Sequence, residues 1–243
     1  TANELCECHA VRRSRGVDRS ASNGNLGVAL KNLNVLLFCA ALPAASAQAA
    51  DRVNDCPIRP ATLCADFDLQ NARLAKADLG MADFARARLS GADLRNANLE
   101  RANLGHASLE RSDLSGAKLT GANLRKAELT GARLARANLH EAHLRAAQMQ
   151  DANLEGARLT RAQLNDVRLD RAQMRDSNLS GANLNRAVLE DADLRGSDLS
   201  NALLQNANLR DADLSGARLN GADFTGAQTR GCKGCPTRTG ATR

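Results

Sequence analysis

The chain has 243 residues, of which 43% are hydrophobic but only 2% aromatic, with no Trp and no Tyr. A compact globular core of this size normally contains larger side chains, so the composition argues against an ordinary globular domain and favours a narrow core. The formal net charge is +6, yet residues 66–227 hold 22 Lys plus Arg and 22 Asp plus Glu, so the excess lies in the flanks.

The N-terminal region predicts export. Val28–Leu42 is strongly apolar, Pro43 and small residues follow it, and Ala47-Gln48-Ala49 is typical of a signal-peptide cleavage site. The apolar run is too short for a comfortable membrane span, although a buried segment or a membrane anchor is the alternative. We expect residues 28–49 to be a signal-peptide-like segment cleaved near Ala49. The mature chain is then periplasmic or secreted, with no membrane span.

Residues 1–27 do not fit a signal peptide. The chain opens with Thr1 rather than Met, and the charged stretch Arg12–Arg19 is long for the start of such a peptide. We expect this N-terminal extension to be disordered or not native, with translation starting near Val28 or Leu30.

Residues 66–227 carry a period of five. Leu or a close substitute occurs at every fifth residue from Leu69 to Phe224, which makes 32 consecutive pentads, and Ala usually lies two residues before each centre. On an α-helix five residues advance by about 140° net, so no apolar face would form. On a straight strand an odd spacing sends successive leucines to opposite faces. Each pentad must therefore contain its own change of direction.

The pentad Gly91–Arg95 shows how that happens. Ala92 and Leu94 are two residues apart and point the same way in an extended stretch, while Asp93 points outward. Turn dipeptides such as Ser90-Gly91 then redirect the chain. Short extended pieces joined by corners of constant sense close into a coil, and stacked coils bury a column of Leu and Ala. Phe67, Phe84 and Phe224 also fall at inward positions.

Runs such as Ala92-Asp93-Leu94, Ala97-Asn98-Leu99 and Ala122-Asn123-Leu124, with their neighbouring glycines, resemble the pentapeptide repeat family over residues 66–227. The resemblance implies an all-β fold, a right-handed quadrilateral parallel β-helix with about eight coils of four pentapeptides. At a strand spacing of about 4.8 Å, such a rod is roughly 38 Å long.

The flanks predict caps that contain cysteine. Residues 50–65 form an expected N-terminal cap, and residues 228–243 an expected C-terminal cap or tail. The mature chain keeps an even number of cysteines, and we expect two local disulfides within the pairs Cys56/Cys64 and Cys232/Cys235. A joint zinc site would require the two ends of the rod to meet. A redox role for Cys232/Cys235 lacks the surrounding thioredoxin-like βαβ pattern.

One face of the predicted rod is basic. The face centred on Phe84, Leu104, Leu124 and Leu144 presents six basic or imidazole side chains against Asp83 alone, and these residues are Arg86, His106, Arg125, Lys126, His143 and Arg145. Such a patch suits an acidic protein surface, a polyanionic glycan or lipid headgroups, whereas the alternative is a solvated face with counterions. Because exposed aromatic residues are lacking, we expect no nucleic-acid partner.

The other outward positions indicate structural roles rather than catalysis or metal binding. The column that starts Asp83, Asn103, Asn123, His143 predicts a hydrogen-bonded ladder between coils. A second column that includes Asp151 and Arg171 predicts ion pairs between coils. His140, Glu141 and His143 wrap one corner but lack a fourth ligand and second-shell partners, so we expect no metal and no cofactor. We also expect that the protein is not an enzyme, because carboxylates on a convex rod do not lie in a cleft that would raise their pKa for acid–base catalysis.

These observations predict an exported, non-enzymatic scaffold whose outward faces bind an unidentified protein or an anionic surface. The alternative is a cytoplasmic gyrase-binding or protective pentapeptide repeat protein. Some pentapeptide repeat proteins bind gyrase through an acidic surface that imitates DNA. Such imitation requires a strong negative field, which a neutral rod lacks. The ends of the coil stack are edge strands, so we expect the flanks to cover them or two chains to pair through them as a homodimer.

Overall fold

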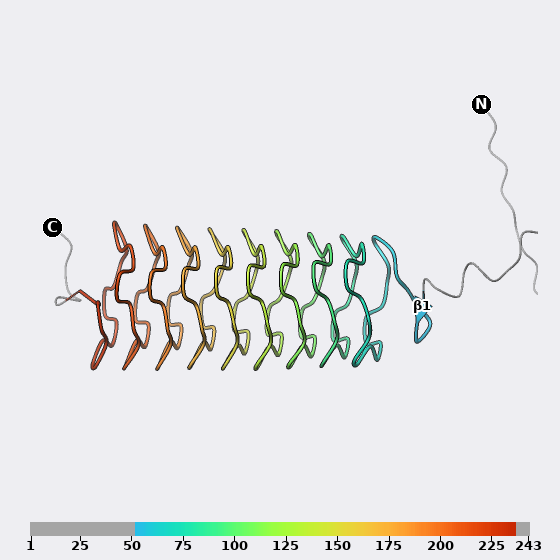
Figure 1. Cartoon of the computed structure of the whole chain (residues 1–243), viewed down its shortest axis with the longest axis horizontal. Helices are drawn as coiled ribbons and strands as arrows, with labels where there is room; N and C mark the ends of the chain where they lie inside the picture. Colours follow the sequence, from blue (N-terminus) through green and yellow to red (C-terminus); the bar gives the residue numbers. More distant parts are fainter. Residues whose placement is uncertain (1–51, 237–243) are drawn as a thin grey trace, which may run out of the picture. The chain divides into compact units, whose positions relative to one another are not determined.

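The computed structural model describes residues 52–236 (Figure 1). The extension 1–27, the signal-peptide-like segment 28–49 and residues 237–243 of the tail lie outside the described residues. Within residues 52–236, no helix is long and apolar enough to cross a membrane.

A short hairpin precedes the repeats. Strand β1 (Arg52–Val53) pairs antiparallel with β2 (Cys56–Pro57), with Val53 opposite Cys56. Asn54 and Asp55 form the turn with φ of 47° and 64°, the left-handed values that a two-residue hairpin turn requires. The cap expected over residues 50–65 therefore contains a hairpin that the pentad pattern does not predict.

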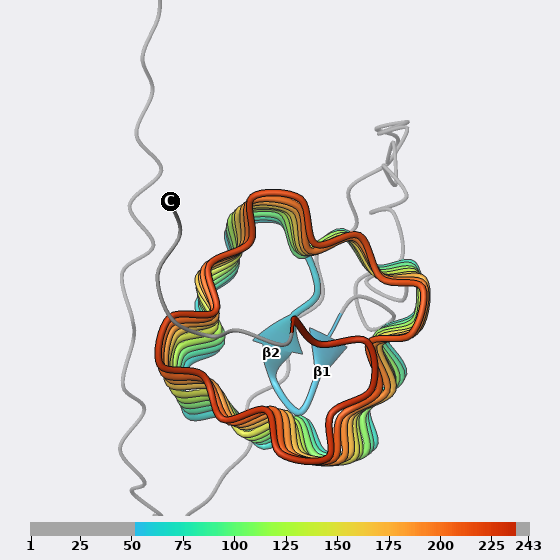
Figure 2. The ribbon, with the colours of Figure 1, turned by 90° about the vertical axis from the view of Figure 1, so that its left-hand side faces the viewer.

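After the hairpin the chain coils with a period of twenty residues. Parallel bridges join residues twenty apart without interruption, from Leu63 with Asp83 to Asp213 with Lys233. Viewed along the stack, each coil has four sides (Figure 2). One side therefore corresponds to one pentad, and equivalent residues of successive coils lie directly above one another.

Each corner is a tight turn. The Ala72 N–H donates to the Leu69 carbonyl at 3.1 Å, and Asn71 between them has φ of 55°. Only the third residue of the turn is left-handed, which is the signature of a type II turn. The same position is left-handed in every pentad, and Gly fills many of these corners; others hold Asn, Asp or Arg. The turn dipeptides of the sequence thus mark the corners as predicted.

Three backbone hydrogen bonds per pentad join neighbouring coils. Leu124 N–H donates to the His143 carbonyl at 2.7 Å, and Lys126 N–H donates to the Arg145 carbonyl at 3.0 Å. In the opposite direction, His143 N–H donates to the Ala122 carbonyl at 2.9 Å. Because both sides of every inner coil are bonded in this way, the faces of the rod are stiff supports for their side chains.

The core is a column of Leu and Ala. The central Leu residues and the Ala two before them are fully buried in nearly every coil. Each buried Leu stabilises the fold by about 1.5–3 kcal/mol. Phe84 and Phe224 are buried as predicted, but Phe67 is only partly buried, since it lies in the first coil, where the stack begins.

Three serines replace Ala in this column. Ser112 Oγ donates to the Leu109 carbonyl at 2.6 Å, and Ser177 Oγ donates to the Met174 carbonyl at 2.7 Å. The Ser197 hydroxyl is buried without a partner in the described part of the chain. Two of the three hydroxyls thus donate to the carbonyl three residues earlier, and the third is accommodated without a partner in the described chain.

Candidate interaction surface

The basic face is less positive than its sequence indicates. Arg86 makes a bidentate ion pair with Asp66 one coil earlier, with Nε–Oδ1 at 2.7 Å and Nη2–Oδ2 at 2.6 Å. This hydrogen-bonded guanidinium lowers the pKa of Asp66. Arg145 Nε lies 3.5 Å from Asp166 Oδ2 one coil later. From the sequence, Asp83 alone is expected to oppose the positive charge of this face. In the structure the carboxylates of Asp66 and Asp166 also do so.

Arg125 and Lys126 form the basic centre of the face. Both side chains are exposed, and neither makes an ion pair with any of residues 52–236. Arg125 and Lys126 are the two central residues of one corner turn, closed by the Ala127 N–H, which donates to the Leu124 carbonyl at 3.1 Å, and Lys126 has φ of 56°. His106 occupies the equivalent corner one coil earlier with φ of 59°. We call Arg125, Lys126 and His106 the basic patch.

The predicted ladder runs beside this patch. Asn103 Nδ2 donates to Asp83 Oδ1 at 2.8 Å, and Asn123 Nδ2 donates to Asn103 Oδ1 at 2.8 Å. The ladder prediction is confirmed over these three residues. It stops at His143, whose Nδ1 is buried without a partner among the described residues. The ladder fixes side chains that border the patch, since Asn123 Oδ1 also accepts from the Arg125 N–H at 3.3 Å, and the His143 side chain is half-buried.

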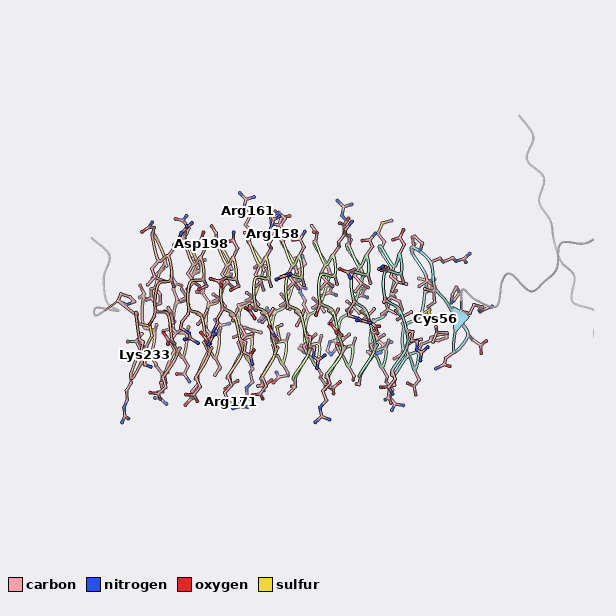
Figure 3. The ribbon with its side chains drawn as sticks, viewed as in Figure 1. Cys56, Arg158, Arg161, Arg171, Asp198 and Lys233 are labelled. Carbon is pink, nitrogen blue, oxygen red and sulfur yellow. A yellow bond between two sulfur atoms is a disulfide. The ribbon has the colours of Figure 1, made fainter. Side chains whose placement is uncertain are left out.

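On other faces some charges are paired, whereas others, such as those of Lys118 and Arg158, have no ion pair within residues 52–236. Arg171 binds Asp151 at 2.8 Å through both carboxylate oxygens, which confirms the predicted ion pair between coils. Arg95 makes a bidentate pair with Asp93, and this hydrogen-bonded guanidinium lowers the pKa of Asp93 to about 2. Exposed pairs of this kind are worth about 0–1 kcal/mol each. Figure 3 shows the long side chains, including Arg171, projecting outward from the rod.

The structure does not gather the His140 corner into a metal site. His140 Nδ1 shares a hydrogen bond with Thr160 Oγ1 at 2.6 Å, and His140 Nε2 lies 3.5 Å from Glu141 Oε1. Glu141 also faces Arg161 at 3.8 Å. Within residues 52–236, no group of three or more His, Cys, Asp or Glu side chains is placed to hold a metal ion.

Two surface features were missed by sequence reasoning. An open groove of about 560 Å³ follows the corners where Ser115, Ala135 and Gly156 are small, with Arg136 and Asp176 at its margins. In the two columns that line the groove, Glu155 follows Ser115 and Ala135, and Arg136 separates Gly116 from Gly156, so no run of small residues twenty apart marks it in the sequence. On another face, a hydrogen bond with the carboxyl group of Glu110 raises the pKa of Glu128. Neither feature encloses a site for chemistry, since the groove is open to solvent and mixed in charge.

The cysteines lie at the two ends of the repeat. The structure joins Cys56 to Cys64 and Cys232 to Cys235. Cys56 of β2 and Cys64 of the first coil are fully buried, whereas Cys232 and Cys235 pack partly buried against the end of the core. Each bond closes a local loop, so it ties a cap to the coil beside it.

The stacked, four-sided coil with a smooth charged surface defines a parallel β-solenoid. Family models for pentapeptide repeats match residues 68–105, 97–136 and 187–226, and one for the pentapeptide repeat region matches residues 122–199. The chain therefore belongs to the pentapeptide repeat family, whose members form right-handed quadrilateral β-helices.

Solved structures with the same repeat are similar to it. HetL, a pentapeptide repeat protein involved in heterocyst differentiation regulation from the cyanobacterium Nostoc, is 34% identical, covers 71% of this chain and 89% of its own, and gives a TM-score of 0.51. A pentapeptide repeat protein from the cyanobacterium Cyanothece is 25% identical over 50% of this chain and 90% of its own, with a TM-score of 0.34. QnrB1, a plasmid-mediated fluoroquinolone resistance protein, is 17% identical over 70% of this chain and 90% of its own, with a TM-score of 0.38. No curated protein matches the chain.

Proposed function

We propose that this chain is an exported, non-enzymatic scaffold that binds an acidic partner protein through its basic patch. Residues 66–227 would form about eight coils of four pentapeptides, since residues twenty apart are bridged. Pentapeptide repeat proteins are generally structural or binding scaffolds rather than enzymes. The resemblance to HetL, which is involved in the regulation of heterocyst differentiation, supports binding as the activity.

The observation that carries the proposal is the pair Arg125 and Lys126. Arg86 and Arg145 on the same face are each paired with a carboxylate. Arg125 and Lys126 are adjacent in the sequence and make no ion pair within residues 52–236, so they retain two neighbouring positive charges on a rigid support. Unpaired charges of one sign steer a partner of the opposite sign and contribute to the rate of association. A flat face of bonded coils offers this charge without any cost of ordering the backbone.

An acidic protein suits the patch better than a glycan or a lipid surface. The chain has no Trp or Tyr on which sugar rings would stack, and Phe84, nearest the patch, is buried. The patch also lacks an exposed apolar side chain that would enter a bilayer. A protein with a ribbon of carboxylates matches both the charge and the flatness of the face.

Charge reversal tests this proposal. The full chain is passed over immobilised poly-glutamate at low salt, as wild type and as the double variant Arg125→Glu/Lys126→Glu. The matched control, Lys118→Glu/Arg158→Glu, makes the same change in net charge at two exposed residues of another face that have no ion pair within residues 52–236. The patch variant is expected to lose about tenfold in affinity, which corresponds to about 1.4 kcal/mol. Equal losses in both variants would show that only net charge matters and would refute the patch.

Export rests on separate observations. Two disulfides at the ends of the rod are typical of an oxidising compartment, and the apolar segment before the described residues ends in a cleavage-like motif. N-terminal sequencing of protein from the cell envelope and medium is expected to give a start near Ala50. Recovery of uncleaved, reduced chain from the cytoplasm would overturn export and favour the gyrase-binding alternative, which the neutral repeat otherwise disfavours.

A further inference from the structure

The two ends of the coil stack differ. At the N-terminal end the hairpin lies across the first coil, and Figure 2 shows β1 and β2 within the outline of the solenoid. The Asn54 side chain donates to the Asp68 carbonyl at 2.7 Å, and this carbonyl lies on the outer edge of the first coil. The Cys56–Cys64 bond ties the hairpin to the first coil. The N-terminal edge is therefore covered by the chain itself.

At the C-terminal end the coil-to-coil bonds run out. One coil before the end the pattern is complete: Leu204 N–H donates to the Asp223 carbonyl at 2.7 Å, and Asn206 N–H donates to the Thr225 carbonyl at 2.9 Å. Asp223 N–H in turn donates to the Ala202 carbonyl at 2.9 Å. Every pentad thus directs two N–H groups and one carbonyl toward the coil that follows it.

In the last coil these three groups face outward. Phe224 N–H, Gly226 N–H and the Ala222 carbonyl make no hydrogen bond with any of residues 52–236. Among residues 52–236, the corresponding groups on the sides centred on Leu219 and Thr229 also make no hydrogen bond. Three consecutive sides therefore form what we call the C-terminal edge, residues 216–231.

The corners of this edge carry no side chains. All four left-handed corners of the last coil are glycine, with φ between 70° and 74°, namely Gly216 at 72°, Gly221 at 70°, Gly226 at 70° and Gly231 at 74°. Earlier corners hold many side chains, such as Arg186 and Asn206. Leu219 and Ala222 are only partly buried at this end. The glycines leave the corner N–H groups accessible above a partly exposed apolar core.

The donor pattern selects the kind of partner. A strand that runs parallel to the edge offers a carbonyl, an N–H and a carbonyl per side, as the next coil would, so an extended segment satisfies all three groups. A second copy docked end to end by two-fold symmetry would bring four N–H groups but only two carbonyls to each pair of facing sides, so two N–H groups would stay without an acceptor. Each buried donor left without an acceptor costs about 1–3 kcal/mol. The complementary N-terminal edge of a second copy is covered by its hairpin.

The positive charge of the last coil further restricts the kind of partner that can bind it. Arg218, Arg230 and Lys233 are exposed on the last coil, and Asp223 is its acidic residue within the described chain. Arg218 Nη1 also lies 4.0 Å from Asp198 Oδ2 one coil earlier, a loose pair that leaves the guanidinium exposed. Residues 237–243, which lie outside the described residues, contain Arg238 and Arg243, whose charge has the same sign as that of the edge.

We propose that the C-terminal edge binds an extended, acidic segment of a partner protein by strand addition. Main-chain hydrogen bonds to the open N–H groups supply the affinity, and carboxylates meeting Arg218 and Arg230 supply the selectivity. This proposal does not depend on the basic patch, because it uses other residues at another part of the rod.

Hydrogen exchange of the full chain tests it. The probe is the capped hexapeptide Glu-Thr-Glu-Val-Glu-Thr, and its counterpart with Lys for Glu is the control peptide. The acidic peptide is expected to slow exchange of the Phe224 and Gly226 amides at least tenfold, and the basic peptide to leave them fast. Arg230→Glu is expected to weaken binding of the acidic peptide about tenfold. Arg210→Glu, one coil earlier in the same column, is expected to have little effect.

Three results would overturn strand addition by a partner. The first is exchange that the acidic peptide leaves unchanged. The second is slow exchange without peptide that disappears on dilution, which would identify a second copy as the occupant. The third is slow exchange without peptide that is lost when residues 237–243 are removed, which would identify the chain's own tail.

Discussion

Substitution of Ala137 by leucine tests the spacing of the coils. Ala137 is fully buried, and so are Ala117 and Ala157, which lie twenty residues before and after it in the same column. Hydrogen bonds hold the column on both sides: Asn138 N–H donates to the Ala117 carbonyl at 2.9 Å, and Arg158 N–H donates to the Ala137 carbonyl at 2.9 Å. Leucine adds three heavy atoms where the strand spacing is only about 4.8 Å.

The cost follows from overpacking. Extra methylene groups in a well-packed core destabilise by about 1–3 kcal/mol. For a domain of this size each kcal/mol lowers the melting temperature by about 2–4 °C, so Ala137→Leu is expected to lower it by about 2–12 °C. Ala135→Leu places the same side chain two residues earlier, where Ala135 is outward and half-buried, and is expected to change stability by less than about 0.5 kcal/mol.

Thermal unfolding followed by circular dichroism measures both variants. A lower melting temperature for Ala137→Leu alone supports the inward assignment of this position. Equal melting temperatures for wild type and Ala137→Leu, or an equal loss in both variants, would refute it.

Ser197→Ala removes a buried hydroxyl that has no partner in the described chain and is expected to raise stability by about 1 kcal/mol in urea unfolding; a loss would contradict the unpaired hydroxyl. Gly91→Ala is expected to cost about 1–2 kcal/mol, because φ is 69° and the new methyl group meets Asn71 Oδ1; unchanged stability would contradict this geometry. In carboxyl NMR, Asp93 is expected to titrate near pH 2 and Arg95→Ala to move its pKa toward 3.8, whereas equal pKa values would contradict the ion pair. Since the folded pKa is the lower one, the stability from this pair is present above about pH 4 and is lost as pH falls toward 2.

The fold was predictable because a period of five admits so few solutions. Every pentad from Leu69 onward repeats one extended piece and one corner, so inward and outward positions follow from the residue number alone. The four-sided coil came from the family resemblance, and bridges such as Leu63 with Asp83 confirm the twenty-residue period. The exception is Phe67, which occupies an inward position but is only partly buried, because it lies in the first coil.

The electrostatics of the face were less predictable. The sequence identifies Arg86 and Arg145 as outward, but their neutralisation depends on whether a corner side chain leans toward the coil before or after it. Asp66 pairs with Arg86 across one coil, while Asp166 is approached from both sides by Arg145 and Arg186. These pairings depend on the side-chain rotamers at the left-handed corners, and the five-residue period contains no information on rotamers.

The ends were also beyond the pattern. The hairpin of β1 and β2 uses strands of two residues, too short to leave a periodic signal. The C-terminal edge is visible in the sequence only as glycine at every corner of the last coil, among them Gly216 and Gly226. That signal acquires meaning only when the hydrogen bonds of the preceding coil show which groups are left open.

Site-specific photo-cross-linking in cells tests most directly whether the basic patch binds a partner. A photoreactive side chain replaces His106, which borders Arg125 and Lys126 and leaves both in place. The control position is Asn96, a corner residue ten positions earlier and therefore on the opposite corner of the four-sided coil. The account predicts one discrete adduct with an acidic protein from position 106 and none from position 96. No adduct from position 106, or the same adducts from both positions, would contradict it.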